Sequence, residues 1–258
     1  MTRRTGRPSR RTGARGSRQR REMSEGLVQA LLVPLRGEAL GYTLGFAFAG
    51  IFLSLFAYVG VVVWLVVALV YSGCSAFFGA CLAGARDGNL EPQRADVVPD
   101  GGLTALALPG LAVLFYVLLL IGLGAVLATL TGVDVTYPTA AQQVWLTCLV
   151  FVSTLPFAAG MTLLRSWQTP LALIHVPAQL AVMRAAGVQY LVPALVAMFV
   201  ASVPMTLIMW AYELGFVARF VVMAASCATT GYAFGATGAA MGWIAYHNDD
   251  VADILDAS

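Results

Sequence analysis

The chain has 258 residues, of which 59% are hydrophobic and 11% are charged, and its formal net charge is +2 at pH 7. A soluble domain carries roughly 25% charged residues, so this composition excludes a water-exposed globular fold. In lipid the backbone must satisfy its hydrogen bonds within a helix or a closed barrel, and the apolar runs lack the two-residue alternation of barrel strands. We therefore predict an all-α, multipass transmembrane helical bundle.

Residues 1–23 are an arginine-rich tail that holds nine of the fifteen arginines. Two interpretations remain open: the tail binds anionic lipid headgroups, or it lies upstream of a true translation start at Met23. From Met23 onward there are six arginines against twelve acidic residues, so the formal net charge falls to −6. The tail has no aromatic residue on which bases could stack, and we predict no nucleic-acid partner.

Residues 24–36 are predicted to form an interfacial helix at the membrane surface. Ser24 can cap this helix, and an apolar stripe follows along one side. The stripe consists of Leu27, Leu31, Leu32 and Leu35. The membrane domain then occupies residues 37–247.

The lengths of the uncharged intervals predict about six membrane spans. The interval between Glu38 and Arg86 contains 47 residues. A single helix of that length would extend about 70 Å, against a hydrocarbon core of roughly 30 Å, so the interval holds two spans. The six spans are expected at about Leu40–Tyr58, Val61–Ala83, Leu103–Leu130, Val144–Leu164, Tyr190–Tyr212 and Gly215–Tyr246.

The segment between the fourth and fifth spans is predicted to contain a helix that lies on the membrane surface. Proline suits a first helical turn and glycine suits a helix end, so Pro177 and Gly187 delimit a helix over Pro177–Ala186. The chain closes with an acidic tail, residues 248–258, which carries four aspartates and no arginine.

The distribution of arginine predicts the orientation in the membrane. Five of the six arginines from Met23 onward fall on one side of the six-span arrangement, and only Arg219 falls on the other. Positive charge marks the cytoplasmic side, so both termini are predicted to be cytoplasmic. The abundance of arginine, alanine, glycine and valine is typical of a bacterial coding sequence, and we therefore predict that the protein lies in the cytoplasmic (inner) membrane. Its predicted partners are membrane lipids.

The last span carries one continuous face of small residues, spaced 4, 3, 4, 3 and 4 positions apart. They are Ala224, Ala228, Gly231, Gly235, Gly238 and Gly242. This spacing keeps the face in register along the helix, and small residues let helices approach closely in lipid. We predict that the face packs within the chain, or against a second copy or another membrane protein. Gly41 and Gly45 of the first span are the expected intrachain partner.

No catalytic, cofactor-binding or metal-binding site is predicted. The cysteines all fall inside predicted spans, and two distant histidines cannot form a zinc site. The four cysteines are Cys74, Cys81, Cys148 and Cys227. At the outer turn before the last span, Glu213 and Arg219 are close in sequence, and two interpretations remain open: the two side chains form an ion pair, or each anchors the chain at the membrane interface.

Two segments resemble an uncharacterised prokaryotic family of six-helix membrane proteins, known only as a domain of unknown function. The first is the loop ARDGNLEPQRADVVPD before a proline-containing third span, and the second is PLALIHVPAQLAVMRAAG before the last two spans. The resemblance covers about Gly37–His247. It implies six helices, and it implies no activity or catalytic residue.

Two hypotheses for the function follow. The absence of buried charge and the smooth last span favour a non-enzymatic membrane scaffold or assembly component. The alternative is a transporter or channel for a small or apolar solute, in which helices broken by proline act as hinges or half-helix sites. The prolines in question are Pro109, Pro156, Pro193 and Pro204.

Overall fold

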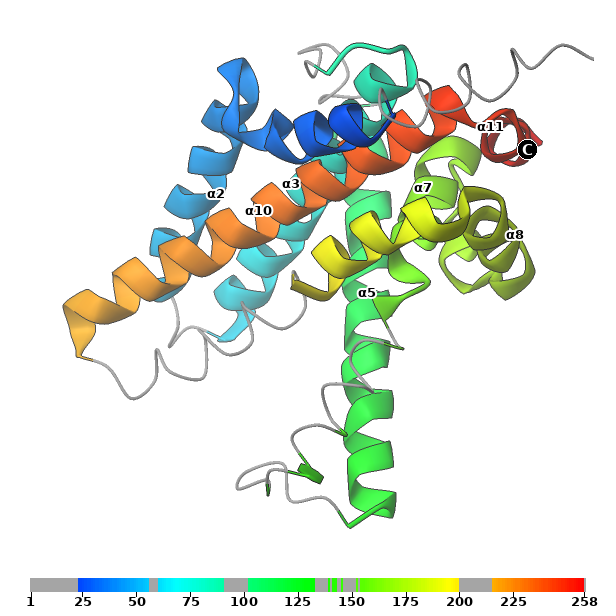
Figure 1. Ribbon diagram of the computed structural model, residues 1–258. Coiled ribbons are helices and arrows are strands. Elements are labelled where there is room, and N and C mark those ends of the chain that lie inside the picture. Colours follow the sequence, from blue (N-terminus) through cyan, green and yellow to red (C-terminus); the bar gives the residue numbers. More distant parts are fainter. Residues whose placement is uncertain are drawn as a thin grey trace, which may run out of the picture.

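The computed structural model describes residues 23–55, 60–90, 102–132, 154–199 and 215–257, with single positions between 139 and 152. Within these ranges every regular element is a helix (Figure 1), which confirms the predicted all-α class. A helix over residues 23–32 continues into the 3-10 turn η1 (Val33–Leu35). The remaining elements are α2 (Gly37–Leu55), α3 (Gly60–Arg86), α5 (Gly102–Leu130), α7 (Phe157–Trp167), η2 (Pro170–Ile174), α8 (Val176–Ala186), η3 (Gly187–Tyr190), a helix over residues 191–199, α10 (Phe216–His247) and α11 (Asp249–Asp256).

Four helical segments in the described ranges are long and apolar enough to cross a membrane. They are Gly37–Leu55, Leu65–Arg86, Val176–Phe199 and Val217–His247. The chain is therefore a helical membrane protein, although these four segments are fewer than the six predicted spans. Most of the predicted fourth span and the second half of the fifth lie outside the described residues.

The third of these segments differs from the expected surface helix followed by a separate span. Helix α8 ends at Gly187, whose φ of 59° lies in the left-handed region, and the turn η3 then leads into residues 191–199. Pro177 occupies the first turn of α8, as predicted. The helix boundaries therefore agree with the sequence pattern to within one residue, and the continuation through η3 was not foreseen.

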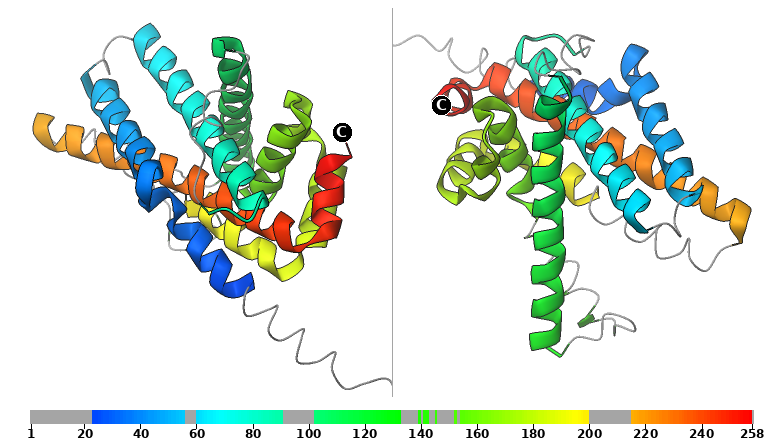
Figure 2. Two further views of the ribbon diagram at one scale, coloured as in Figure 1. Left: turned by 90° about the horizontal axis from the view of Figure 1, so that it is seen from above. Right: turned by 180° about the vertical axis from the view of Figure 1, so that it is seen from behind.

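Helix α10 lies at the centre of the structure and packs against both α2 and α3 (Figures 1 and 2). Residues along α2 meet α10 in reverse order, since Phe46 packs at Gly231 and Gly50 packs at Met223. Helix α2 is thus antiparallel to α10. Helix α3 is parallel to it, because Phe77 packs at Gly235 and Leu82 packs further along, at Gly242.

Two clusters of aromatic rings fill the core on either side of α3. Between α2 and α3, Phe77 lies 5.6 Å from Tyr42 and 6.2 Å from Phe46, measured between ring centroids. The second cluster joins α3, α5, α7 and α10. Its rings are Tyr71, Tyr116, Phe157 and Phe234, with neighbouring centroids 5.6–6.2 Å apart. Aromatic burial of this kind holds the helices together where lipid supplies no hydrophobic driving force.

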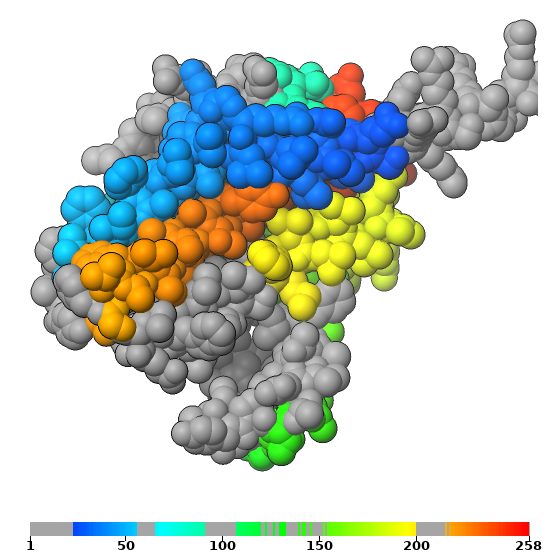
Figure 3. Space-filling view, turned by 60° about the vertical axis from the view of Figure 1, so that its left-hand side comes forward, coloured from blue at the N-terminus to red at the C-terminus, as the bar shows by residue number. Residues whose placement is uncertain are grey.

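The amino-terminal helix lies along α10, as the dark blue and orange surfaces in Figure 3 show. The Trp243 indole N–H donates a hydrogen bond to the Met23 carbonyl oxygen at 3.2 Å, and the Tyr232 hydroxyl donates to the Leu31 carbonyl oxygen at 3.0 Å. The buried face differs from the predicted stripe: Leu27 is buried, whereas Leu32 and Leu35 are exposed. The buried residues of this segment include Met23, Gly26, Leu27, Ala30 and Val33.

The carboxy-terminal residues, predicted only as an acidic tail, form the helix α11. Asn248 caps this helix, since its Oδ1 accepts a hydrogen bond from the Val251 backbone N–H at 3.2 Å. The Asn248 Nδ2 also donates to the Ala185 carbonyl oxygen of α8 at 2.8 Å. Val251 and Leu255 are buried, so α11 is an amphipathic helix docked on α7 and α8 with its aspartates outward. Aspartates in a first helical turn complement the helix dipole.

Candidate functional site

The small-residue face of α10 is closely packed against the neighbouring helices. A Cβ at Gly238 would overlap the Phe78 carbonyl oxygen, and one at Gly242 would overlap the Leu82 carbonyl oxygen. The backbones of α10 and α3 are therefore in direct contact. A Cβ at Gly231 or Gly235 would instead overlap a phenylalanine ring, from Phe46 and Phe77 respectively.

The same face extends towards the beginning of α10, where it meets α2. A Cβ at Gly50 would overlap the Met223 carbonyl oxygen and lie 2.8 Å from the Ala224 Cα. Ala228 is half-buried on this face. Both predicted alanines thus lie on the side of α10 that its glycines use, with α2 as the neighbour at Ala224.

Gly41 and Gly45 lie elsewhere. Both are exposed, and a Cβ at either position would have no heavy atom within 4 Å. Helix α2 does pack on α10, but through Phe46 and Gly50, which lie on a different side of α2 from Gly41 and Gly45. Gly41 and Gly45 therefore do not form the intrachain contact with α10 that their spacing led us to expect.

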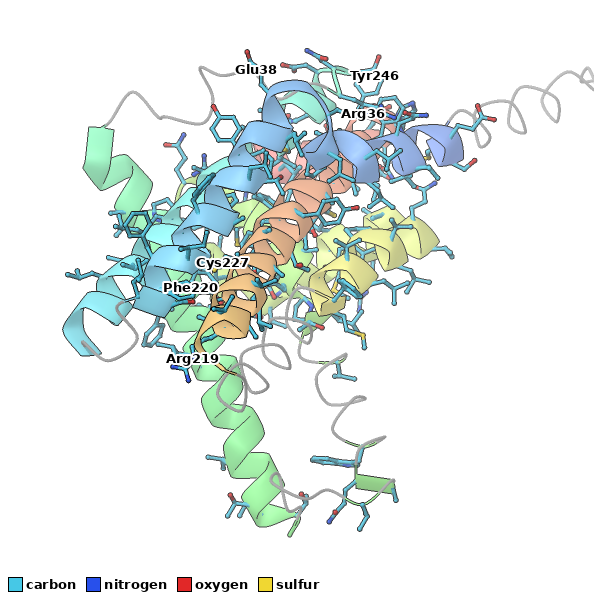
Figure 4. All side chains as sticks on the ribbon, turned by 90° about the vertical axis from the view of Figure 1, so that its left-hand side faces the viewer. Arg36, Glu38, Arg219, Phe220, Cys227 and Tyr246 are labelled. Carbon is cyan, nitrogen blue, oxygen red and sulfur yellow. The ribbon has the colours of Figure 1, made fainter. Side chains whose placement is uncertain are left out.

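The predicted ion pair at the outer turn stays untested, because Glu213 lies outside the described residues. Arg219 is half-buried in the first turn of α10. Figure 4 places it at the opposite end of α10 from Tyr246, and the labels of Tyr246, Arg36 and Glu38 all stand at the top of that view. Its position at an end of the helix agrees with an interfacial anchor.

The histidines and the described cysteines occupy structural positions. The His175 Nδ1 accepts a hydrogen bond from the Ala178 backbone N–H at 3.2 Å and so caps α8. The His247 Nδ1 lies 3.1 Å from the Trp243 carbonyl oxygen. Three buried cysteines are free thiols: Cys74, Cys81 and Cys227. Within the described ranges no three His, Cys, Asp or Glu side chains are grouped to hold a metal ion, and Cys148 lies outside those ranges.

Arg165, in the last turn of α7, is the charged residue that the sequence did not single out. Its guanidinium group lies against Gly79 of α3, in the space that a Cβ would fill. Burial lowers the pKa of this guanidinium below its ordinary value. No hydrogen bond or ion pair joins it to another described residue. In the sequence, Arg165 directly follows a long apolar run, which could have drawn attention to it. Its contact with Gly79 could not be predicted, because the two residues are distant in sequence.

By contrast, the other arginine on this side of α3 has a partner. The Arg86 Nη2 donates to both carboxylate oxygens of Asp256, at 2.6 and 2.5 Å, and this pair ties α3 to α11. Gly79 and Arg86 are seven residues apart, so they lie on the same side of α3. One end of the protein therefore presents a neutralised arginine and, two helical turns away, a desolvated one.

Three buried polar atoms in the described chain have no hydrogen-bond partner. They are the Ser75 Oγ, the Thr237 Oγ1 and the Trp167 Nε1. Ser75 is one turn from Gly79 on α3, and Trp167 follows Arg165 by two residues on α7. Two of these three groups thus lie on the helices that hold the Arg165 side chain, and the third, Thr237, lies on α10.

No protein-family model, curated protein or solved structure matches this chain.

Proposed function

We propose that the protein is a six-span protein of the bacterial cytoplasmic membrane with both termini in the cytoplasm. The directions of the helices support this count. Helices α3 and α10 are parallel, so the chain must cross the membrane an odd number of times between them. Three intervening spans, about 103–130, 144–164 and 190–212, satisfy this requirement.

Helix α7 supplies a further check on direction. Phe157 and Tyr71 both pack on Phe234, and eight residues later along both helices Arg165 packs on Gly79. Helix α7 is therefore parallel to α3, as expected if the fourth span returns to the side where the second span ended. The described arginines support the orientation, because Arg36 lies at the same end of the view as Tyr246 in Figure 4, whereas Arg219 lies at the other end. The arginine-rich side is the cytoplasmic side.

Within this topology the protein acts as a non-enzymatic membrane scaffold or assembly component. The contact of α10 with α2 and α3 carries this proposal. Because a single methyl group at Gly238 or Gly242 would already overlap the α3 backbone, neither water nor a solute fits between these helices. A rigid, closed centre suits a platform that holds partners at its outer faces, and α2 presents Leu44, Phe48 and Phe52 outward.

A transporter or channel for a small or apolar solute is the second candidate, and interrupted helices favour it. Helix α7 begins at Pro156, and residues 191–199 follow the 3-10 turn η3. The buried hydroxyls of Ser75 and Thr237 without partners are groups that a polar solute could use. Breaks and unpaired groups of this kind are typical of transporter binding sites.

Two measurements on the same preparation distinguish the candidates. A scaffold is expected to be recovered from crosslinked native membranes with a membrane-protein partner in fixed ratio, and to give no solute flux in proteoliposomes above that of empty vesicles. Flux of a small solute through proteoliposomes, together with the absence of any crosslinked partner, would contradict the scaffold and support transport.

A further inference from the structure

Three properties of Arg165 together point to a bound ligand. The residue is half-buried, its guanidinium rests on a glycine that leaves room for it, and it has no counter-charge among the described residues. Buried charges are ordinarily paired or hydrogen-bonded, because removing an ion from water without a partner is strongly unfavourable. Within the described part of the chain, the guanidinium donors of Arg165 are therefore available to an anion.

The surroundings of the guanidinium show which anion fits. Arginine presents a planar set of N–H donors that bind carboxylate or phosphate oxygens in pairs, and it stays charged at neutral pH. Arg165 follows the predicted fourth span directly, at the end of the bundle where Arg86 meets Asp256. At this end of the bundle, where the membrane meets the cytoplasm, the abundant anion is the phosphate group of phospholipids. Dissolved phosphate compounds reach the same membrane surface from the cytoplasm.

We infer that Arg165, seated on Gly79 between α3 and α7, binds a phosphate group. Gly79 provides the space, Arg165 provides the charge and the paired donors, and the desolvated surroundings strengthen the interaction. Arg86, two helical turns from Gly79, is already paired with Asp256, whereas Arg165 has no partner among the described residues, so the ligand is assigned to Arg165. The inference is independent of whether the protein is a scaffold or a transporter.

The test uses the purified full-length protein in a neutral detergent. Thermal unfolding is recorded with increasing inorganic phosphate at constant ionic strength, and separately with phosphatidylglycerol or phosphatidylcholine added to the micelles. We expect a saturable rise in the melting temperature. Saturation with inorganic phosphate assigns the site to dissolved phosphate compounds, whereas a response to the lipids alone assigns it to a headgroup, and each of these outcomes supports a phosphate site.

Three variants make the test specific. Arg165→Gln should weaken phosphate binding about tenfold or more, the loss expected for a charge-assisted hydrogen bond. Gly79→Ala keeps every charge but displaces the guanidinium, and should weaken binding as well. Arg184→Gln is the matched control: it removes one positive charge from an exposed arginine of α8 and should leave the apparent affinity unchanged.

Stability without ligand separates a binding role from a structural one. An unpaired buried charge destabilises the free protein, so Arg165→Gln without phosphate should melt at the wild-type temperature or above it. The inference is wrong if neither phosphate nor phospholipid stabilises the wild-type protein. It is equally wrong if Arg165→Gln and Arg184→Gln reduce the response to the same extent, or if Arg165→Gln lowers the melting temperature of the ligand-free protein while the response to phosphate persists.

Discussion

A single added methyl group distinguishes two glycines that look equivalent in the sequence. In Gly238→Ala the new Cβ overlaps the Phe78 carbonyl oxygen, a backbone atom that cannot rotate away. In Gly41→Ala the new Cβ has no heavy atom within 4 Å. Both substitutions gain the same helix propensity, about 1 kcal/mol. Any difference between the two variants therefore measures the contact between α10 and α3.

The expected size follows from these terms. Overpacking costs about 1–3 kcal/mol, and the upper value applies where α10 must move away from the α3 backbone. After the gain in propensity, Gly238→Ala should lower the free energy of unfolding by about 2 kcal/mol, and the bulkier Gly238→Ile by about 3 kcal/mol or more. For a chain of this size, 2 kcal/mol corresponds to a fall in melting temperature of about 4–8 °C. Gly41→Ala should raise it by about 2–4 °C.

The assay is thermal unfolding of the purified protein in detergent, with gel filtration of each variant. Gel filtration also tests whether Gly41 lies in a contact between copies, because Gly41→Ala would then reduce the size of the assembly. The account of α10 is refuted if Gly238→Ala melts at or above the temperature of Gly41→Ala.

Three further predictions concern the topology and the cytoplasmic end. A reporter that is active only in the periplasm should be active when fused after Thr136 and inactive when fused after Gln93; the reverse pattern would invert the orientation. Asn248→Ala removes the cap of α11 and its bond to α8, and should cost about 1–2 kcal/mol in thermal unfolding, with accelerated hydrogen exchange confined to α11. An unchanged exchange rate there would mean that Asn248 does not hold the helix. Asp256→Asn should cost less than about 1 kcal/mol, and its effect should vanish at high salt, because the pair with Arg86 is solvent-exposed.

The features that sequence predicted well are those set by one element alone. The all-α class follows because the long apolar runs require lipid as their surroundings, and backbone groups in lipid must be hydrogen-bonded within their own helix. The limits of α8 follow from the local preferences of Pro177 and Gly187. The small face of α10 was visible because spacing along a single helix determines which residues share a side.

The features that sequence did not predict depend on how helices cross. Gly41 and Gly45 have the same spacing as the glycine pairs of α10, and only the crossing of α2 and α10 selects Phe46 and Gly50 for the contact. Arg165 gains its unusual surroundings from Gly79, which lies 86 positions earlier in the chain. Helix α11 was missed for a local reason, since the capping asparagine was grouped with the acidic residues that follow it.

The central place of α10 has a consequence for biogenesis. Both of its main partners, α2 and α3, are synthesised well before α10, and even α3 ends 130 residues before α10 begins. At about 5–20 residues per second, they wait in the bilayer for roughly ten seconds without the helix that covers them. During that interval Phe77 and the bare backbone at Phe78 face lipid, so an insertion factor or a neighbouring nascent helix would find them accessible. Quality control of this protein should therefore act on chains that have inserted α3 but not yet α10.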